Sequence, residues 1–147
     1  MNSSTKKSEL IKMALNARQF SHSPYSGKKI GAAIQLSNGL LFSGCNIENA
    51  SYGGTVCAER VAIWKAYSEN SNQLKITAVA VASDEKSPWP PCGLCRQVMA
   101  EFSTPETEIY LVNTQTQEAG KEPGEEKALN FAELFPFAFE PGHLLKK

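Results

Sequence analysis

The pattern of apolar and polar positions predicts helices and strands in alternation. The segment SELIKMALNARQF has apolar side chains at helical spacing, and Ser8 is its expected N-cap. Two apolar runs, at 30–36 and 40–45, flank Asn38 and Gly39, a pair that favours positive φ in a tight hairpin turn. We therefore expect one helix followed by an antiparallel strand pair.

The middle of the chain predicts two helices and two longer strands. A helix buried over much of its circumference begins at Cys57, and a second helix runs from about Cys92 to Phe102. The β-branched and alanine-rich run at 76–83 is typical of a strand covered on both faces. Residues 108–113 predict another strand, so the order is strand, helix, strand, helix, strand.

The last third of the chain is less regular. TQTQEAGKEPGEEK is polar and glycine-rich, which predicts a mobile loop before a short last strand near 127–130. The tail FAELFPFAFEPGHL holds four phenylalanines, which we expect either to cover the core or to contact a neighbouring subunit.

Length and composition narrow the class of protein. A chain of 147 residues with 41% apolar content fits a single domain, residues 1–147. Lysine plus arginine and aspartate plus glutamate both number 15, so no basic field favours nucleic acid or a membrane. The start of the chain lacks the apolar run of a signal peptide, and we expect a cytoplasmic protein that binds a small molecule.

Three cysteines have the spacing of a metal site. In the reducing cytoplasm cysteines seldom form disulfides, and metal or catalytic roles gain weight. Cys92 and Cys95 lie three residues apart on one helix turn, and Cys57 opens the other helix. If the strands before these helices are neighbours in one sheet, both helix N-termini emerge at the same edge. Three thiolates then hold zinc and leave a fourth position for water.

Two charged residues next to Cys57 suggest chemistry at that metal. Glu59 is near enough to act as general base, although a glutamate in a first turn can also serve only the helix dipole. Arg60 can hydrogen-bond to cysteine sulfurs and offset their charge, or form a surface salt bridge. Cys45 fits a small buried thiol; as a fourth ligand it would instead make a structural zinc site without chemistry.

These residues resemble a known family. CAE followed by PCGLC is the cysteine form of the zinc-deaminase signature, and GCNIENASYGGTVCAER is similar to the small homotetrameric cytidine deaminases. The resemblance implies an α/β fold, a three-layer α/β/α sandwich with a mixed five-stranded sheet. It also implies one Zn²⁺ per subunit and the deamination of cytidine and deoxycytidine in pyrimidine salvage, with Glu59 shuttling protons.

The resemblance extends to the substrate-binding residues. Asn46 and Glu48 are implied to bind the ribose hydroxyls, and Ala58 to offer backbone contacts to the pyrimidine. From the residues alone, Asn46 and Glu48 could equally be turn formers at a strand end. Tyr52 and Phe139 correspond to residues that reach a neighbouring subunit's site, which implies a homotetramer with shared active sites.

One position departs from the family pattern. Where the family has an aromatic side chain that packs against the pyrimidine, PYSGKKIGAA has Lys28. We hypothesise that Lys28 folds its stem over the base, or that the pocket is wider and accepts modified cytidines. A related deaminase acting on a nucleoside antibiotic such as blasticidin S is the alternative enzyme, and editing of polynucleotides is disfavoured by the balanced charge.

Overall fold

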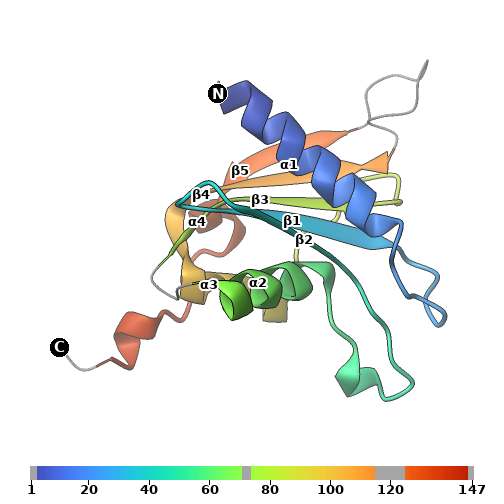
Figure 1. Cartoon of the computed structure of the whole chain (residues 1–147). Helices are drawn as coiled ribbons and strands as arrows, with labels where there is room; N and C mark the ends of the chain where they lie inside the picture. Colours follow the sequence, from blue (N-terminus) through green and yellow to red (C-terminus); the bar gives the residue numbers. More distant parts are fainter. Residues whose placement is uncertain (1–2, 71–73, 115–124, 146–147) are drawn as a thin grey trace.

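A mixed five-stranded sheet lies between helices on both of its faces (Figure 1). The computed structural model describes residues 3–70, 74–114 and 125–145. Within the sheet the strands follow the order β2-β1-β3-β4-β5, and only β3 and β4 pair in parallel. The strand bounds are β1 Ile30–Leu36, β2 Leu41–Cys45, β3 Ile76–Ser83, β4 Ser103–Asn113 and β5 Glu126–Asn130. This is the three-layer α/β/α sandwich that the resemblance implies.

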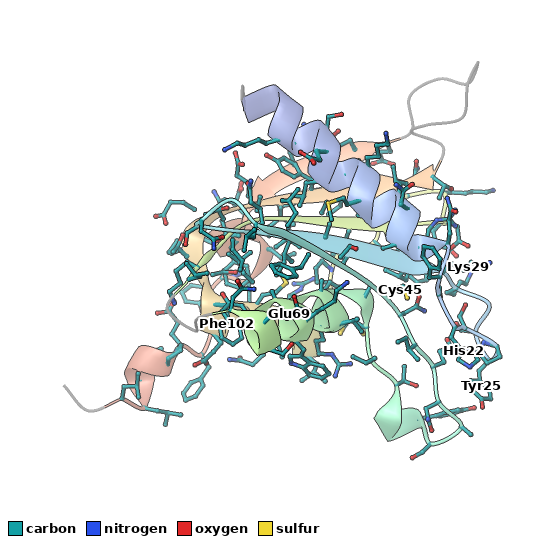
Figure 2. The ribbon with its side chains drawn as sticks, in the orientation of Figure 1. His22, Tyr25, Lys29, Cys45, Glu69 and Phe102 are labelled. Carbon is teal, nitrogen blue, oxygen red and sulfur yellow. The ribbon has the colours of Figure 1, made fainter. Side chains whose placement is uncertain are left out.

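Helix α1 covers one face of the sheet, and α2 and α3 cover the other (Figure 1). Strand β3 shows how both faces are filled: Ala78 and Ala80 pack with α1, whereas Val79 packs in the core cluster that includes α2 and α3. Buried side chains fill the space on both sides (Figure 2). The helical elements are α1 Ser3–Arg18, α2 Ala58–Glu69, α3 Gly93–Phe102 and α4 Phe131–Leu134, with 3-10 turns at Tyr52–Gly54 and Pro141–His143.

Several predicted elements are confirmed and two boundaries are wrong. The hairpin turns at Gly39, whose φ of 89° only glycine adopts without strain. Ser8 does not cap α1, which begins at Ser3; within its polar first turns Lys7 forms an ion pair with Glu126 of β5. Strand β4 begins at Ser103 instead of 108: Ser103 pairs with Ile76 of β3, and after an irregularity the ladder continues from Glu108 opposite Ala78.

The two strands that precede α2 and α3 are not neighbours in the sheet. The prediction that both helices begin at one sheet edge had assumed that they are. Strand β1 lies between β2 and β3 and is antiparallel to both, so β2 and β3 run in the same direction. Their carboxyl ends therefore still reach one edge of the sheet, and both helices begin there.

The C-terminal tail has a buried part and an exposed part. Phe131 and Leu134 are buried in the core, whereas Phe137 is fully exposed and Phe139 is half exposed. The loop predicted from the polar, glycine-rich segment lies mostly at 115–124, outside the described residues. Within the described part of the chain, no helix is both long and apolar enough to cross a membrane.

Candidate metal centre

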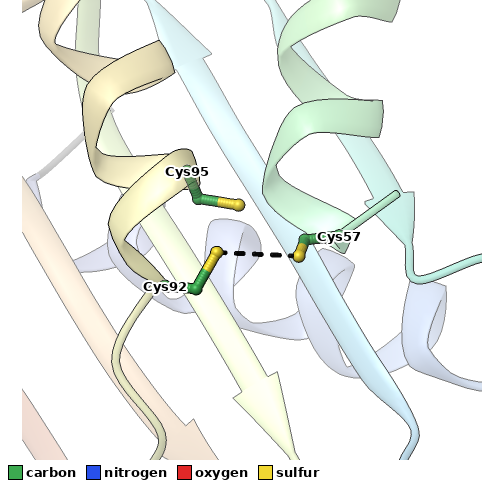
Figure 3. A group of neighbouring side chains, drawn as sticks. All are labelled: Cys57, Cys92 and Cys95. Carbon is green, nitrogen blue, oxygen red and sulfur yellow. Dashed lines mark hydrogen bonds between the residues drawn. The ribbon is translucent and has the colours of Figure 1, made fainter. Parts of the chain in front are cut away.

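Two helix N-termini bring three cysteines together (Figure 3). Cys57 is the N-cap of α2 and Cys92 is the N-cap of α3, and Cys95 lies one turn further along α3. An N-cap side chain lies outside its own helix, and a residue three positions on faces the same way. The partial positive charge at both N-termini favours thiolates at this place.

The spacing of the sulfurs fits one tetrahedral zinc ion. All three Sγ atoms lie within 4.8 Å of one another, and Cys57 Sγ is 3.8 Å from Cys92 Sγ. Two sulfurs bound to one zinc at tetrahedral angles stand about 3.8 Å apart. Among the described residues the donor set is three thiols without a fourth protein ligand, which is the set of a metal site that keeps one position open for water.

Hydrogen bonding within the cluster prepares Cys57 as a thiolate. The hydrogen bond with Cys95, together with those of Arg60 and Cys92, lowers the pKa of Cys57 to about 5 against the effect of burial. The same hydrogen bond, with burial, raises the pKa of Cys95. Cys95 must therefore lose its proton when a metal binds, so that metal binding releases protons.

Arg60 takes the position expected next to the sulfurs. Its Nη2 is 3.7 Å from Cys57 Sγ and 3.3 Å from the carbonyl oxygen of Thr55. Burial opposes the charge of Arg60, but its hydrogen bonds to Cys57 and Cys95 raise its pKa overall. The guanidinium thus offsets the negative charge of the cluster and ties it to residue 55.

Glu59 is buried next to the cysteines. Its side chain is 4% exposed, and burial raises the pKa of Glu59 to about 7, with a further upward contribution from the Cys57 thiolate. A carboxyl whose pKa lies near neutrality can both accept and donate a proton at working pH. A glutamate that only served the helix dipole would lie in solvent, which this one does not.

Cys45 does not belong to the cluster. Among the described residues the group able to hold a metal consists of three cysteines, and Cys45 is not one of them. It ends β2 (Figure 2), where burial raises its thiol pKa. The four-cysteine structural zinc site therefore lacks its fourth ligand here.

Asn46 and Glu48 hold the loop that follows α1. Asn46 Oδ1 accepts from the backbone N–H of Ile30, and its Nδ2 donates to the carbonyl of Lys28 at 2.8 Å. The Glu48 carboxylate accepts from the backbone N–H of Tyr25 at 2.9 Å and from Ser26. Tyr25 lies on this loop (Figure 2). Part of the hydrogen-bonding capacity of both side chains is thus used within the chain.

A cavity of about 390 Å³ adjoins these residues. It is lined by Tyr25, Ser26, Glu48, Tyr52 and Thr55. Because the carbonyl of Thr55 accepts a hydrogen bond from the same arginine that approaches Cys57, this cavity lies next to the cysteine cluster.

The other residues predicted to bind substrate differ in how exposed they are and in what they contact. Ala58 is fully buried as the first residue of α2. Tyr52 is 77% exposed and meets Tyr25 edge to face, and the half-exposed Phe139 stacks on His143. The ammonium of Lys28 forms an ion pair with Glu85 and lies over the ring of Trp89.

Sequence reasoning missed the partners of the predicted residues. Tyr25, Ser26 and Thr55 lie in loops without periodicity, so only their spatial contact with Glu48 and Arg60 reveals them. Trp89 carried a usable signal, because an aromatic residue between prolines just before Cys92 has no reason to serve a helix or strand.

Three thiols and a buried carboxylate at the edge of an α/β/α sandwich define the class of zinc-binding deaminases. The family model described as the cytidine and deoxycytidylate deaminase zinc-binding region matches residues 4–111. The chain belongs to this cytidine and deoxycytidylate deaminase family.

Individual relatives agree over most of their length. A cytidine deaminase of Halalkalibacterium halodurans is 47% identical over 130 residues, covering 88% of this chain and 91% of that protein. One of Sporosarcina psychrophila is 40% identical over 131 residues, or 89% of each. The crystal structure of a Burkholderia pseudomallei cytidine deaminase superposes with a TM-score of 0.78 at 38% identity, covering 95% of this chain and 100% of that one.

Proposed function

We propose that this chain catalyses the hydrolytic deamination of cytidine and deoxycytidine to uridine and deoxyuridine, with release of ammonia. The observation that carries the proposal is the buried Glu59 carboxyl, which lies next to three converging cysteine sulfurs. The named cytidine deaminases that it resembles over most of their length support the same substrate class.

The metal and the carboxylate divide the chemistry. Cys57, Cys92 and Cys95 would hold a zinc ion, which would supply the Lewis acidity that brings the pKa of a bound water near neutrality. Glu59 accepts a proton from the attacking water and delivers it to ring N3, which makes C4 electrophilic. After the water oxygen has added to C4, Glu59 transfers the second proton to the amino group. The C4–N bond then breaks and ammonia leaves.

Residues around the cavity would hold the rest of the nucleoside. Glu48 keeps lone pairs for the ribose hydroxyls, and Asn46 keeps one N–H after its bond to Lys28. The backbone of Ala58, directly after the ligand Cys57, would meet the pyrimidine. Arg60 would offset the thiolate charge and so keep the metal a stronger Lewis acid.

The wider context of the protein is proposed from the family. We infer a single catalytic domain that works in the cytoplasm in pyrimidine salvage, as a homotetramer with one zinc per subunit. The resemblance assigns Tyr52 and Phe139 to a neighbouring subunit's site, and both side chains are exposed enough to reach one.

One assay tests the reaction and its mechanism. Ultraviolet spectra should show cytidine converted to uridine by the zinc-loaded native protein, and a chelator should stop the reaction. Glu59→Gln should lose at least about a thousandfold in kcat while keeping one zinc per chain. An active Glu59→Gln variant would overturn the mechanism, and activity on blasticidin S without activity on cytidine would favour the antibiotic deaminase.

A further inference from the structure

Trp89 lies in a stiff segment that leads directly into the metal cluster. It stands between prolines in Pro88-Trp89-Pro90-Pro91, and Cys92 follows. Prolines fix φ and favour an extended run of about 3.1 Å per residue, so Trp89 begins about 9 Å from the ligand. The far end of this run is fixed, because the carbonyl of the buried Pro91 accepts a 2.8 Å hydrogen bond from Arg96 Nε.

The indole of Trp89 lies beneath the ammonium of Lys28, which in turn is paired with Glu85. The ammonium of Lys28 is 5.8 Å from the centroid of the Trp89 ring and forms an ion pair with Glu85. The indole is nevertheless 40% exposed, so part of its surface is left for another contact. A tryptophan in a hydrophobic core would not keep so much surface in water.

The contacts of Lys28 connect the indole to the cavity. The backbone N–H of Lys28 donates to Ser26 Oγ at 3.0 Å, and Ser26 lines the cavity. Thr55 also lines the cavity, and its carbonyl oxygen accepts from Arg60, which approaches Cys57. Contacts thus run from the indole through Lys28 and Ser26 to the cavity, and from the cavity through Thr55 and Arg60 to Cys57; we call this series of residues the rim.

The charge of Lys28 is already balanced. Since Glu85 pairs with the ammonium, Lys28 offers no unpaired cation for a phosphate group. In addition to hydrogen-bonding groups, the rim offers the π surface of Trp89. The face of any pyrimidine ring can stack on this surface.

We propose that Trp89 is the aromatic side chain that packs against the substrate's pyrimidine, and that Lys28 and Glu85 position it. The β3–α3 loop thus supplies the ring that position 28 lacks. This inference rests on the proposed function and names a specificity-determining residue for it.

Kinetics on cytidine test the role of Trp89. Trp89→Ala should raise KM at least about tenfold and leave kcat within about threefold, because stacking binds substrate and transition state alike. Trp89→Phe should keep most of the native KM. Phe20→Ala removes another exposed aromatic ring, away from the rim, and should behave as native. A native KM in Trp89→Ala would overturn the inference.

Moving the aromatic ring from position 89 to position 28 gives a sharper test. In the Trp89→Ala background, Lys28→Phe should restore KM to within about threefold of native, since a ring at position 28 would occupy the vacated space. Lys28→Leu is the matched control and should not restore it. Equal effects of phenylalanine and leucine would show that no aromatic contact is involved. Zinc content and circular dichroism identify variants that have not folded.

Binding provides a readout independent of turnover. The chain has two tryptophans, so Trp64→Phe leaves Trp89 as the single tryptophan, which can be excited selectively over the four tyrosines. Uridine should quench its emission saturably, and Glu85→Gln should weaken that binding with little change in kcat, as expected of a positioning residue. Absence of quenching in a native protein that does deaminate cytidine would refute the role of Trp89 and leave the proposed function intact. Failure to deaminate cytidine would refute the proposed function instead.

Discussion

Gly44 in β2 touches the first turn of α2 so closely that a Cβ atom at Gly44 would stand 2.7 Å from the carbonyl oxygen of Ala58. The same Cβ would lie 2.6 Å from the backbone nitrogen of Ala62. Real Cβ atoms do not approach main-chain atoms so closely, so the absence of a side chain at Gly44 sets how near α2 lies to the sheet. This contact positions the helix turn that carries Glu59.

Gly44→Ala should therefore destabilise the protein by roughly 3 kcal/mol, because rigid backbone on both elements has to move apart. Zinc-saturated protein unfolded in urea would show the loss. Gly53→Ala is the matched control, since a Cβ there meets nothing within 4 Å. We expect its free energy of unfolding to stay within about 0.5 kcal/mol of native. Equal stability of both variants would contradict the proposed close contact.

The geometry of the metal cluster predicts which cysteines are needed for zinc binding. Serine in place of Cys57, Cys92 or Cys95 should lower zinc affinity at least about a hundredfold, because a hydroxyl replaces a thiolate. Cys45→Ser should keep one zinc per chain, since Cys45 is not part of the cluster. Titration with a competing chelator measures both. Zinc loss in Cys45→Ser, with the fold retained, would revive the four-ligand structural site.

The sequence predicts the parts of this site that follow from local helix geometry, but not the parts that follow from sheet topology. Cys92 and Cys95 are neighbours on one helix turn, so their convergence follows from helix geometry alone. Cys57 joins them only because β2 and β3 run in the same direction, and the insertion of β1 between these strands is not encoded in any local pattern. The sequence therefore predicted the correct sheet edge for the metal cluster, but from the wrong assumption that β2 and β3 are adjacent strands.

Loops account for most of what sequence reasoning could not supply. Glu48 was expected to bind ribose, but its contacts with Tyr25 and Ser26 span more than twenty residues and follow no period. Likewise, the position of Trp89 beside Lys28 depends on how two loops pack. Hydrophobic periodicity describes elements that bury one face, and loops of this kind bury none.

The contacts of Glu48 predict a pH effect on the loop. The hydrogen bond from the Ser26 hydroxyl lowers the pKa of Glu48 below its ordinary 4.5 against the effect of burial, with help from the N–H groups of Tyr25 and Ser26. A depressed carboxyl pKa stabilises the folded loop above about pH 4.5, and this contribution is lost as the pH falls through the lower, folded-state pKa.

Amide chemical shifts of Tyr25 and Ser26 would follow that transition. Both should show a step with a common midpoint below 4.5. In Glu48→Gln the amides should show no such step, because the glutamine does not titrate. A midpoint above 4.5 would mean that the carboxylate does not accept these hydrogen bonds.

Shared active sites can be tested by mixing two inactive proteins. If Phe139 completes the site of a neighbouring subunit, Phe139→Ala spoils its neighbour's site, whereas Glu59→Gln spoils its own. Random exchange of equal amounts should then yield up to about a quarter of the sites with an intact Glu59 and a partner's Phe139. Activity should rise from near zero after exchange. Mixing Glu59→Gln with the Glu59→Gln, Phe139→Ala double variant should recover none. If Phe139 instead served its own chain, every site in the first mixture would lack one of the two groups, and no activity would return.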